Sequence, residues 1–213
     1  MNETSTRAQI VEAADGLFYR QGYERTSFAD IAGAVKISRG NFYFHFKSKD
    51  GILDAVIDAR LGRTQRLLAR WEAGAGDPAE RIRNFIRMVA DQRGDLGRFG
   101  CPVGTLCAEL SKVDHPAQRR AAGLFSLYRG WLGRQFEELG CGGRSDALAM
   151  HLLARSQGIA VLGNAFRDEA FIKQEATALV AWLDEVAASA AGARPNEPRR
   201  AQPLKRSRRP KRS

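Results

Sequence analysis

Apolar residues recur at helical spacing along almost the whole chain, and this feature restricts the possible folds more than any other. Residues 6–20, for example, place Ile10, Ala14, Leu17 and Phe18 on one face of a helix. Runs of alternating β-branched residues, which are typical of strands, are few. The sequence therefore predicts an all-α protein.

Caps and helix breakers divide this pattern into separate helices. Gly22 ends the first helix, Thr26 or Ser27 caps a second, Ser38 opens a third and Ser48 caps a fourth. Two later helices are predicted to begin at Pro78 and Pro102, and three more are predicted at residues 115–139, 146–167 and 169–189. The predicted loops lie at 72–80, 92–100 and 140–146. Short helices near the N-terminus and long ones after it indicate a small domain joined to a larger one.

Composition excludes several classes of protein. Of 213 residues, 44% are hydrophobic, enough for a sizeable core, yet no run of 18 apolar residues suggests a membrane span. The N-terminus lacks the pattern of a signal peptide, and three cysteines (Cys101, Cys107 and Cys141) without metal-site spacing fit a reducing compartment. We expect a cytoplasmic protein that does not associate with membranes.

The positive charge of the chain is concentrated at its C-terminus. The net charge is +10, and residues 194–213 hold nine Lys or Arg and one Glu, so the remaining residues carry about +2. This segment contains four prolines and little to bury, which predicts a disordered basic tail. Such a tail could add nonspecific phosphate contacts or act only as a solubilising extension.

The segment KISRGNFYFHFKSKDGIL at residues 36–53 mixes aromatic and basic residues. It overlaps residues 27–46, which hold two short helices joined by a turn of about three residues, the spacing of a helix-turn-helix. With Phe42 and Phe46 as core anchors, the outward positions are Arg39, Asn41, Tyr43 and His45. Arg suits guanine, Asn suits adenine, and Tyr, His and the nearby Lys49 suit phosphate. An ordinary amphipathic helix with a solvated polar face is the alternative.

The segment TSFADIAGAVKISRGNFYFHFKSKDGIL closely resembles the DNA-binding domain of the TetR family of bacterial repressors. The resemblance covers residues 6–60 in detail and rests on an ordered set: Thr26, Ile31, Ala32, Ser38, Gly40, Tyr43, His45, Phe46 and Lys49. It implies an all-helical homodimer that reads a near-palindromic operator in double-stranded DNA. It also implies phosphate contacts from Thr26, Ser27, Tyr43, His45 and Lys49, and base contacts from Arg39 and Asn41. Lys36 and Ser38 complete the expected DNA-binding set.

Lys36 departs from the family pattern, which usually has Gly in this turn. A residue with a Cβ atom in a left-handed conformation costs about 1 kcal/mol. We expect either a slightly different turn or a phosphate contact from Lys36 that offsets the strain.

The resemblance also implies two domains, a helix-turn-helix domain at residues 4–64 and an effector and dimerisation domain at 65–193, which the basic tail at 194–213 follows. The last two helices would form a four-helix bundle with those of a second copy. Their apolar residues suit this arrangement, although some could belong to an intramolecular core: Leu148, Leu152, Ile159, Leu162, Phe171, Leu179, Val180 and Leu183.

The segment RFGCPVGTLCAEL at residues 98–110 places Cys101 before Pro102, so that Cys101 becomes a helix N-cap. Helix amides and the nearby Arg98 would lower the pKa of its thiol and raise its reactivity. The segment resembles the corresponding region of TetR-family sensors of electrophiles, and Cys101 aligns with the sensing cysteine of the N-ethylmaleimide-responsive branch. The alternative is that Cys101 is only a small buried hydrophobic residue. We expect that role for Cys107, and we expect Cys141 to be exposed.

Candidate residues for an effector pocket are aromatic or isolated polar side chains on apolar helices. They are Phe85, Met88, Cys101, Cys107, Phe125, Tyr128, Trp131, His151, Arg155 and Gln157. Such a pocket suits a small hydrophobic or electrophilic effector. No metal cluster, cofactor motif or catalytic constellation is evident, so we expect no cofactor and no enzyme. A sequence-indifferent DNA binder, or an effector-binding protein on an inherited regulator fold, is the alternative function.

Overall fold

The computed structural model describes residues 5–192, and within this range it is built from helices alone. The predicted basic tail at 194–213 lies outside the described residues. The helices are α1 Thr6–Gln21, α2 Phe28–Val35, α3 Arg39–His45, α4 Lys49–Gly74, α5 Pro78–Asp91, α6 Arg93–Phe99, α7 Pro102–Lys112, α8 Gln118–Glu138, the short 3-10 helix Gly142–Arg144, α9 Ser145–Phe166 and α10 Glu169–Gly192. The all-α prediction is confirmed.

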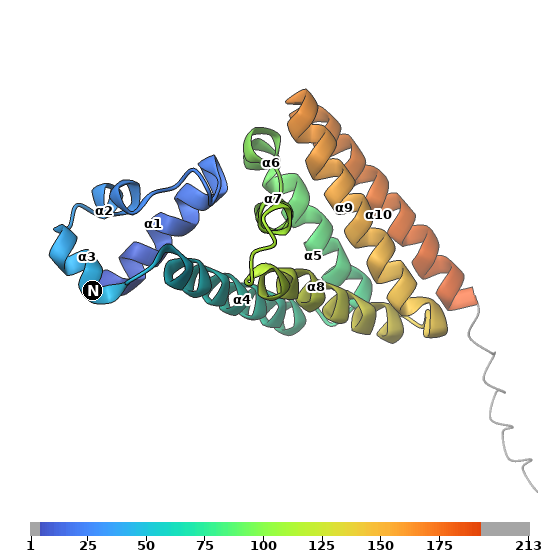
Figure 1. The fold of residues 1–213 in the computed structure, drawn as a ribbon. Helices are drawn as coiled ribbons and strands as arrows, with labels where there is room; N and C mark the ends of the chain where they lie inside the picture. The colour runs from blue at the N-terminus through green and yellow to red at the C-terminus, as the bar shows by residue number, and fades with distance from the viewer. Residues whose placement is uncertain (1–4, 193–213) are drawn as a thin grey trace, which may run out of the picture.

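Helices α1, α2 and α3 form a small head at one end of the molecule, and α4 runs from this head into the larger part (Figure 1). The head has its own core, in which Ile10, Phe18, Ile31, Phe42 and Val56 are all buried. The two parts are not separate bodies, because α7 and the start of α8 also contribute to this core. The boundary predicted after residue 64 falls inside α4.

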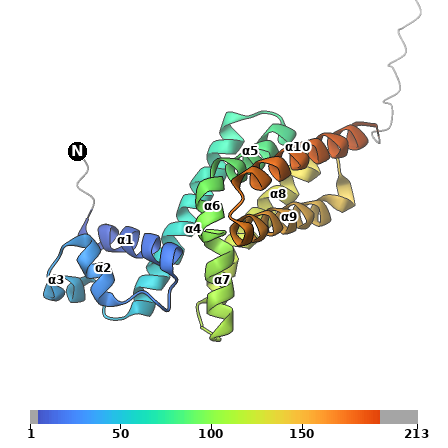
Figure 2. The ribbon, with the colours of Figure 1, turned by 90° about the horizontal axis from the view of Figure 1, so that it is seen from above.

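The larger part packs α5, α8, α9 and α10 around a second core that includes both buried and partly buried tryptophans. Helices α9 and α10 lie side by side on the outer flank, far from α3 (Figures 1 and 2). Gly163 allows their close approach, because a Cβ atom there would lie 2.4 Å from Ile172. Of the residues predicted to pair across a dimer, four are buried within the chain: Leu152, Ile159, Leu179 and Leu183.

Two local predictions are wrong. Residues 92–100, predicted as a loop from their glycines, contain α6, because Leu96 and Gly97 are buried there and the Asn164 side chain donates to the Gly97 carbonyl at 3.1 Å. Tertiary packing here overrides low helix propensity. Cys141 is buried rather than exposed, because it joins the second core and its thiol pKa is raised by burial.

Candidate nucleic-acid interface and ligand cavity

Helices α2 and α3 form a helix-turn-helix whose turn is Lys36, Ile37 and Ser38. The Ser27 hydroxyl caps α2 and exchanges hydrogen bonds with Asp30 in a capping box. The Ser38 hydroxyl caps α3 by accepting from the Asn41 amide at 3.3 Å. The two predicted caps therefore fix where each helix begins.

Lys36 adopts the left-handed conformation that its place in the turn requires, with φ 59° and ψ 40°. Its amide donates to the Gly33 carbonyl at 3.3 Å, and the next amide reaches the Ala32 carbonyl at 3.4 Å. The turn thus closes as it would with glycine, and the chain accepts a strain of about 1 kcal/mol. The Lys36 side chain is exposed.

Two phenylalanines fix the orientation of α3. Phe42 and Phe46 are buried in the core of the head, and Phe42 packs edge-on against Phe28 with ring centroids 5.1 Å apart. Arg39 and Asn41 are exposed, as the helical spacing predicts. Tyr43 is half-exposed and stacks on Phe28 at 5.6 Å, which leaves its edge toward solvent.

The other predicted phosphate contacts have roles within the head. The Thr26 hydroxyl is buried, donates to the Gly22 carbonyl at 2.7 Å and accepts from Gln21, so it holds the α1–α2 loop rather than facing the surface. The Lys49 ammonium donates to the Tyr23 carbonyl at 3.1 Å and lies 4.2 Å from the centroid of the Tyr23 ring. His45 lies half-buried in the last turn of α3.

Helix α7 ties the larger part to the head, a link that sequence reasoning missed. The Glu109 carboxylate accepts from the amides of Tyr23 and Glu24 at 2.9 and 2.8 Å. The Tyr23 hydroxyl donates to Asp50 at 2.5 Å, which lowers the pKa of Asp50, and the His115 ring lies 3.6 Å from the same carboxylate. Partners 86 residues apart leave no local pattern in the sequence.

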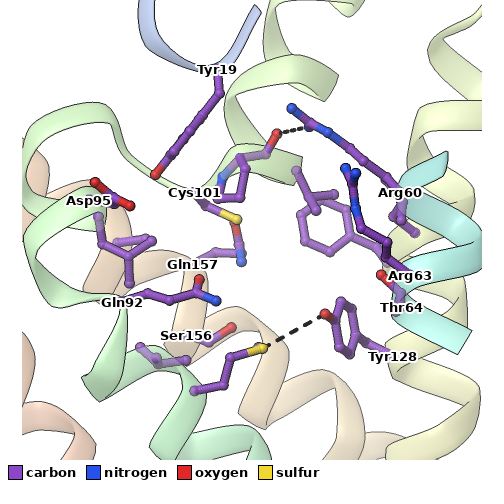
Figure 3. Close-up of a pocket in the computed structure, with 18 of the residues that line it drawn as sticks. Tyr19, Arg60, Arg63, Thr64, Gln92, Asp95, Cys101, Tyr128, Ser156 and Gln157 are labelled. Atoms are coloured by element: carbon purple, nitrogen blue, oxygen red, sulfur yellow. Dashed lines mark hydrogen bonds between the residues drawn. The ribbon is translucent and has the colours of Figure 1, made fainter. Parts of the chain in front are cut away.

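A cavity of about 580 Å³ opens between the head and the larger part (Figure 3). Six of the ten predicted effector residues line it: Phe85, Met88, Cys101, Phe125, Tyr128 and Gln157. Leu124, Leu153 and Ala160 extend the apolar wall, while Gln92 and Gln157 point amide groups into the cavity. Most of the lining surface is apolar, as in small-molecule sites, but charged side chains of α1 and α4 also border the cavity.

The opposite wall is built by α1 of the head, which contributes Glu12, Asp15, Gly16 and Tyr19. The Arg60 guanidinium on α4 donates to Asp15 at 2.6 Å and to the Pro102 carbonyl at 2.5 Å. Arg63 bridges Asp15 and Glu12. We call Asp15, Arg60 and Arg63 the clamp, because these residues join α1 to α4 at the edge of the cavity.

Tyr19 and Cys101 meet where α1 approaches the start of α7. The Tyr19 hydroxyl donates to the Gly100 carbonyl at 2.8 Å, and burial raises the pKa of Tyr19 to about 12. Cys101 is the N-cap of α7, as predicted, and its sulfur accepts from the Gly104 amide at 3.4 Å. Its half-buried thiol faces the cavity beside Gln157 (Figure 3).

The remaining four predicted effector residues do not line this cavity. Cys107 packs against the core of the head, and burial raises its thiol pKa. Trp131 is buried in the second core beside Trp71. His151 is exposed against Trp182, and Arg155 pairs with Glu175 at 2.8 Å. Helical spacing indicated which side chains are isolated on an apolar helix, but not which face borders the cavity.

A profile of the bacterial regulatory proteins of the tetR family matches residues 10–56. The regulator LmrA of Bacillus subtilis (strain 168) is 30% identical over 152 residues, which are 70% of this chain and 79% of LmrA. The chain belongs to the TetR family. The matched profile spans the helix-turn-helix of this chain, and LmrA is a transcriptional regulator of the helix-turn-helix type.

Other relatives of this TetR-family chain match over shorter stretches. The regulator TtgR of Pseudomonas putida is 46% identical over 89 residues, 41% of this chain and 42% of TtgR. The crystal structure of the reduced form of E. coli NemR has a TM-score of 0.72 at 18% identity, covering 85% of this chain and 97% of NemR, which shows a shared fold. The chain spans only 42% to 65% of the length of three of its curated relatives.

The described part of this TetR-family chain has neither a metal cluster nor a membrane-spanning helix. Within residues 5–192, no group of three His, Cys, Asp or Glu side chains could hold a metal ion. Over the same residues, no helix combines the length and the apolar character that crossing a membrane requires.

Proposed function

We propose that this TetR-family regulator is a cytoplasmic repressor that binds a near-palindromic operator as a homodimer. Residues 4–64 would bind the DNA, and residues 65–193 would hold the effector and the dimer interface. The observation that carries this proposal is the cavity, because one of its walls is α1, the helix on which α2 packs. An effector in the cavity therefore touches the DNA-binding head itself.

The clamp suggests how the signal passes. Arg60 and Asp15 are nearly buried at the edge of the cavity, and they set the position of α1 against α4. An effector that binds more tightly when α1 is displaced shifts the population toward that arrangement. In a dimer, displacement of both heads changes the spacing of the two α3 helices, and they lose register with successive major grooves.

The homodimer is supported by the exposed apolar side chains of α9. They are Met150, Val161, Leu162 and Phe166, and Phe166 is 74% exposed. Helices α9 and α10 form an uncovered outer flank of the chain (Figure 2). Large apolar residues grouped on one flank mark an interaction surface, and a second copy of the same flank would cover them.

Arg39→Ala and Asn41→Ala test the base contacts. Each change should weaken operator binding by about 1–3 kcal/mol and relax sequence preference, because each removes a donor that can bind a base edge. The measurement is fluorescence anisotropy with the operator and with single-base variants of it. Lys36→Ala is the control, because its side chain is exposed and loss of a phosphate contact should weaken binding to all duplexes alike. Unchanged preference in Arg39→Ala and Asn41→Ala would contradict the assignment.

The effector is proposed to be a small hydrophobic molecule, and a change in the cavity wall tests this. Ala160→Phe should lower the affinity for an environment-sensitive apolar fluorophore by about tenfold or more, because the new ring occupies space that the probe's apolar groups would fill. Ala69→Phe, at an exposed position of α4 that lines neither the cavity nor the proposed dimer flank, is the control. Equal probe affinities in the two variants would place the probe outside the cavity.

Thiol modification is a second candidate signal, and it would place the chain in the electrophile-responsive branch of the family. It is favoured by the position of the Cys101 sulfur on the cavity wall, at the first turn of α7. N-ethylmaleimide should then release the operator from the wild type but not from Cys101→Ser. Release from both proteins would assign the effect to Cys107 or Cys141, and release from neither would leave a noncovalent effector.

A further inference from the structure

Phe44 is the most exposed large hydrophobic residue in the described part of the chain, at 78%. It follows the buried Phe42 by two positions, and an α-helix turns by about 100° per residue. Phe44 therefore lies about 200° around α3 from Phe42, on the face opposite the core of the head. This is the face that a helix-turn-helix presents to DNA.

Packing within the chain does not account for an aromatic side chain at this position. Phe42 and Tyr43 both contact Phe28, whereas the ring contact recorded for Phe44 is with its neighbour His45, at 5.2 Å. The proposed dimer flank does not account for it either, because α3 lies at the opposite end of the molecule from α9 and α10 (Figure 2).

The surroundings of Phe44 allow α3 to approach DNA closely. Gly40 lies one turn earlier on the same face, and a Cβ atom there would meet nothing within 4 Å. The exposed polar side chains of Arg39 and Asn41 belong to the same short helix. The outward face thus has an apolar ring at one end and a glycine at the other, with hydrogen-bonding groups beside them.

We propose that Phe44 reads the C5-methyl group of a thymine in the operator. Among the major-groove edges of the four bases, only thymine presents a methyl group, and phenylalanine is a suitable apolar partner for it. Unlike the neighbouring Tyr43, a phenyl ring has no hydroxyl group that could donate to a phosphate. Its favourable contribution to binding comes from burying its apolar surface, and that of the thymine methyl group, away from water. This inference rests on the proposed function and adds to it a position in each half-site where thymine is required.

The test uses an operator selected from a random duplex library with the full chain. Each thymine of the operator is replaced in turn by deoxyuridine, which removes only the methyl group. We expect the wild type to lose about fourfold in affinity per half-site at one or two thymines, as burial of one methyl group predicts. Phe44→Ala should bind the thymine and deoxyuridine duplexes equally, so that the two changes are not additive.

Two further variants make the result specific. Phe44→Leu, which restores an apolar side chain, should recover part of the preference for thymine. Arg39→Ala should weaken binding yet keep the thymine preference, which shows that the preference is not lost with affinity in general. Circular dichroism of each variant checks that the helices are retained.

The proposal is overturned if the wild type binds every deoxyuridine duplex as tightly as the thymine operator, or if Phe44→Ala keeps the thymine preference. Both outcomes leave an operator-specific regulator intact. Failure of the proposed function gives a different result, in which no sequence is enriched from the library and a shuffled duplex binds equally well; that result removes this inference as well.

Discussion

Phe42→Ala is expected to lower the free energy of unfolding by about 3–5 kcal/mol, the largest effect of any single change considered for this regulator. Phe42 is 1% exposed and anchors α3 against Phe28. Truncation loses the transfer free energy of the ring and leaves a cavity that a small three-helix head has few side chains to fill. Urea denaturation followed by circular dichroism measures the change. Operator affinity should fall with it, because α3 loses the contact that orients its outward face.

Phe44→Ala is the matched control for this prediction. It removes the same side chain from the same helix, two residues away, but from a solvent-exposed position. We expect it to change the free energy of unfolding by about 0.5 kcal/mol or less. Similar losses in the two variants would mean that α3 is not oriented as described.

Asp15→Asn is expected to cost about 3 kcal/mol of stability. The side chains of Asp15 and Arg60 are 13% and 8% exposed, and their contact is 2.6 Å long. Asparagine keeps the shape of the side chain and one acceptor oxygen, but it removes the charge that pairs with the nearly buried Arg60 guanidinium and turns the other oxygen into a donor that faces an arginine. Breaking one partner of a buried pair is costly for this reason.

Glu12→Gln provides the control for Asp15→Asn. Glu12 also bonds a clamp residue, Arg63, but its side chain is 74% exposed. An exposed pair contributes about 0–1 kcal/mol, so we expect a loss of about 0.5 kcal/mol or less. If Asp15→Asn were as mild as Glu12→Gln, the clamp would not hold α1, and the proposed route from the cavity to the head would lose its basis.

The sequence predicted the head in more detail than the cavity, and the reason is physical. Caps such as Ser27 and Ser38, and the alternation of Phe42 with outward residues, are local patterns that fix short helices and their faces. The sequence left open whether the turn at Lys36 differs from the family pattern, and the structure has Lys36 in the left-handed conformation. Local patterns could not indicate that Thr26 and Lys49 are engaged within the head.

The cavity depends on contacts between segments far apart in the chain. Its α1 wall, with Asp15 and Tyr19, went unpredicted because these residues read simply as the polar side of an amphipathic helix. Trp131 was predicted at the effector site because it is an aromatic residue on an apolar helix, yet it is buried in the second core. Which side of a helix borders a cavity is decided by tertiary packing, which periodicity alone does not determine.

The most direct test of the central claim is the ratio of affinities for the selected operator and for a shuffled duplex of the same base composition. It is measured by fluorescence anisotropy at near-physiological salt, for the full chain and for a chain that ends at residue 192. We predict a ratio of about 10³ or more in both proteins, because sequence is read by α3, while removal of the basic tail lowers both affinities together. A ratio near one in either protein would contradict an operator-reading repressor.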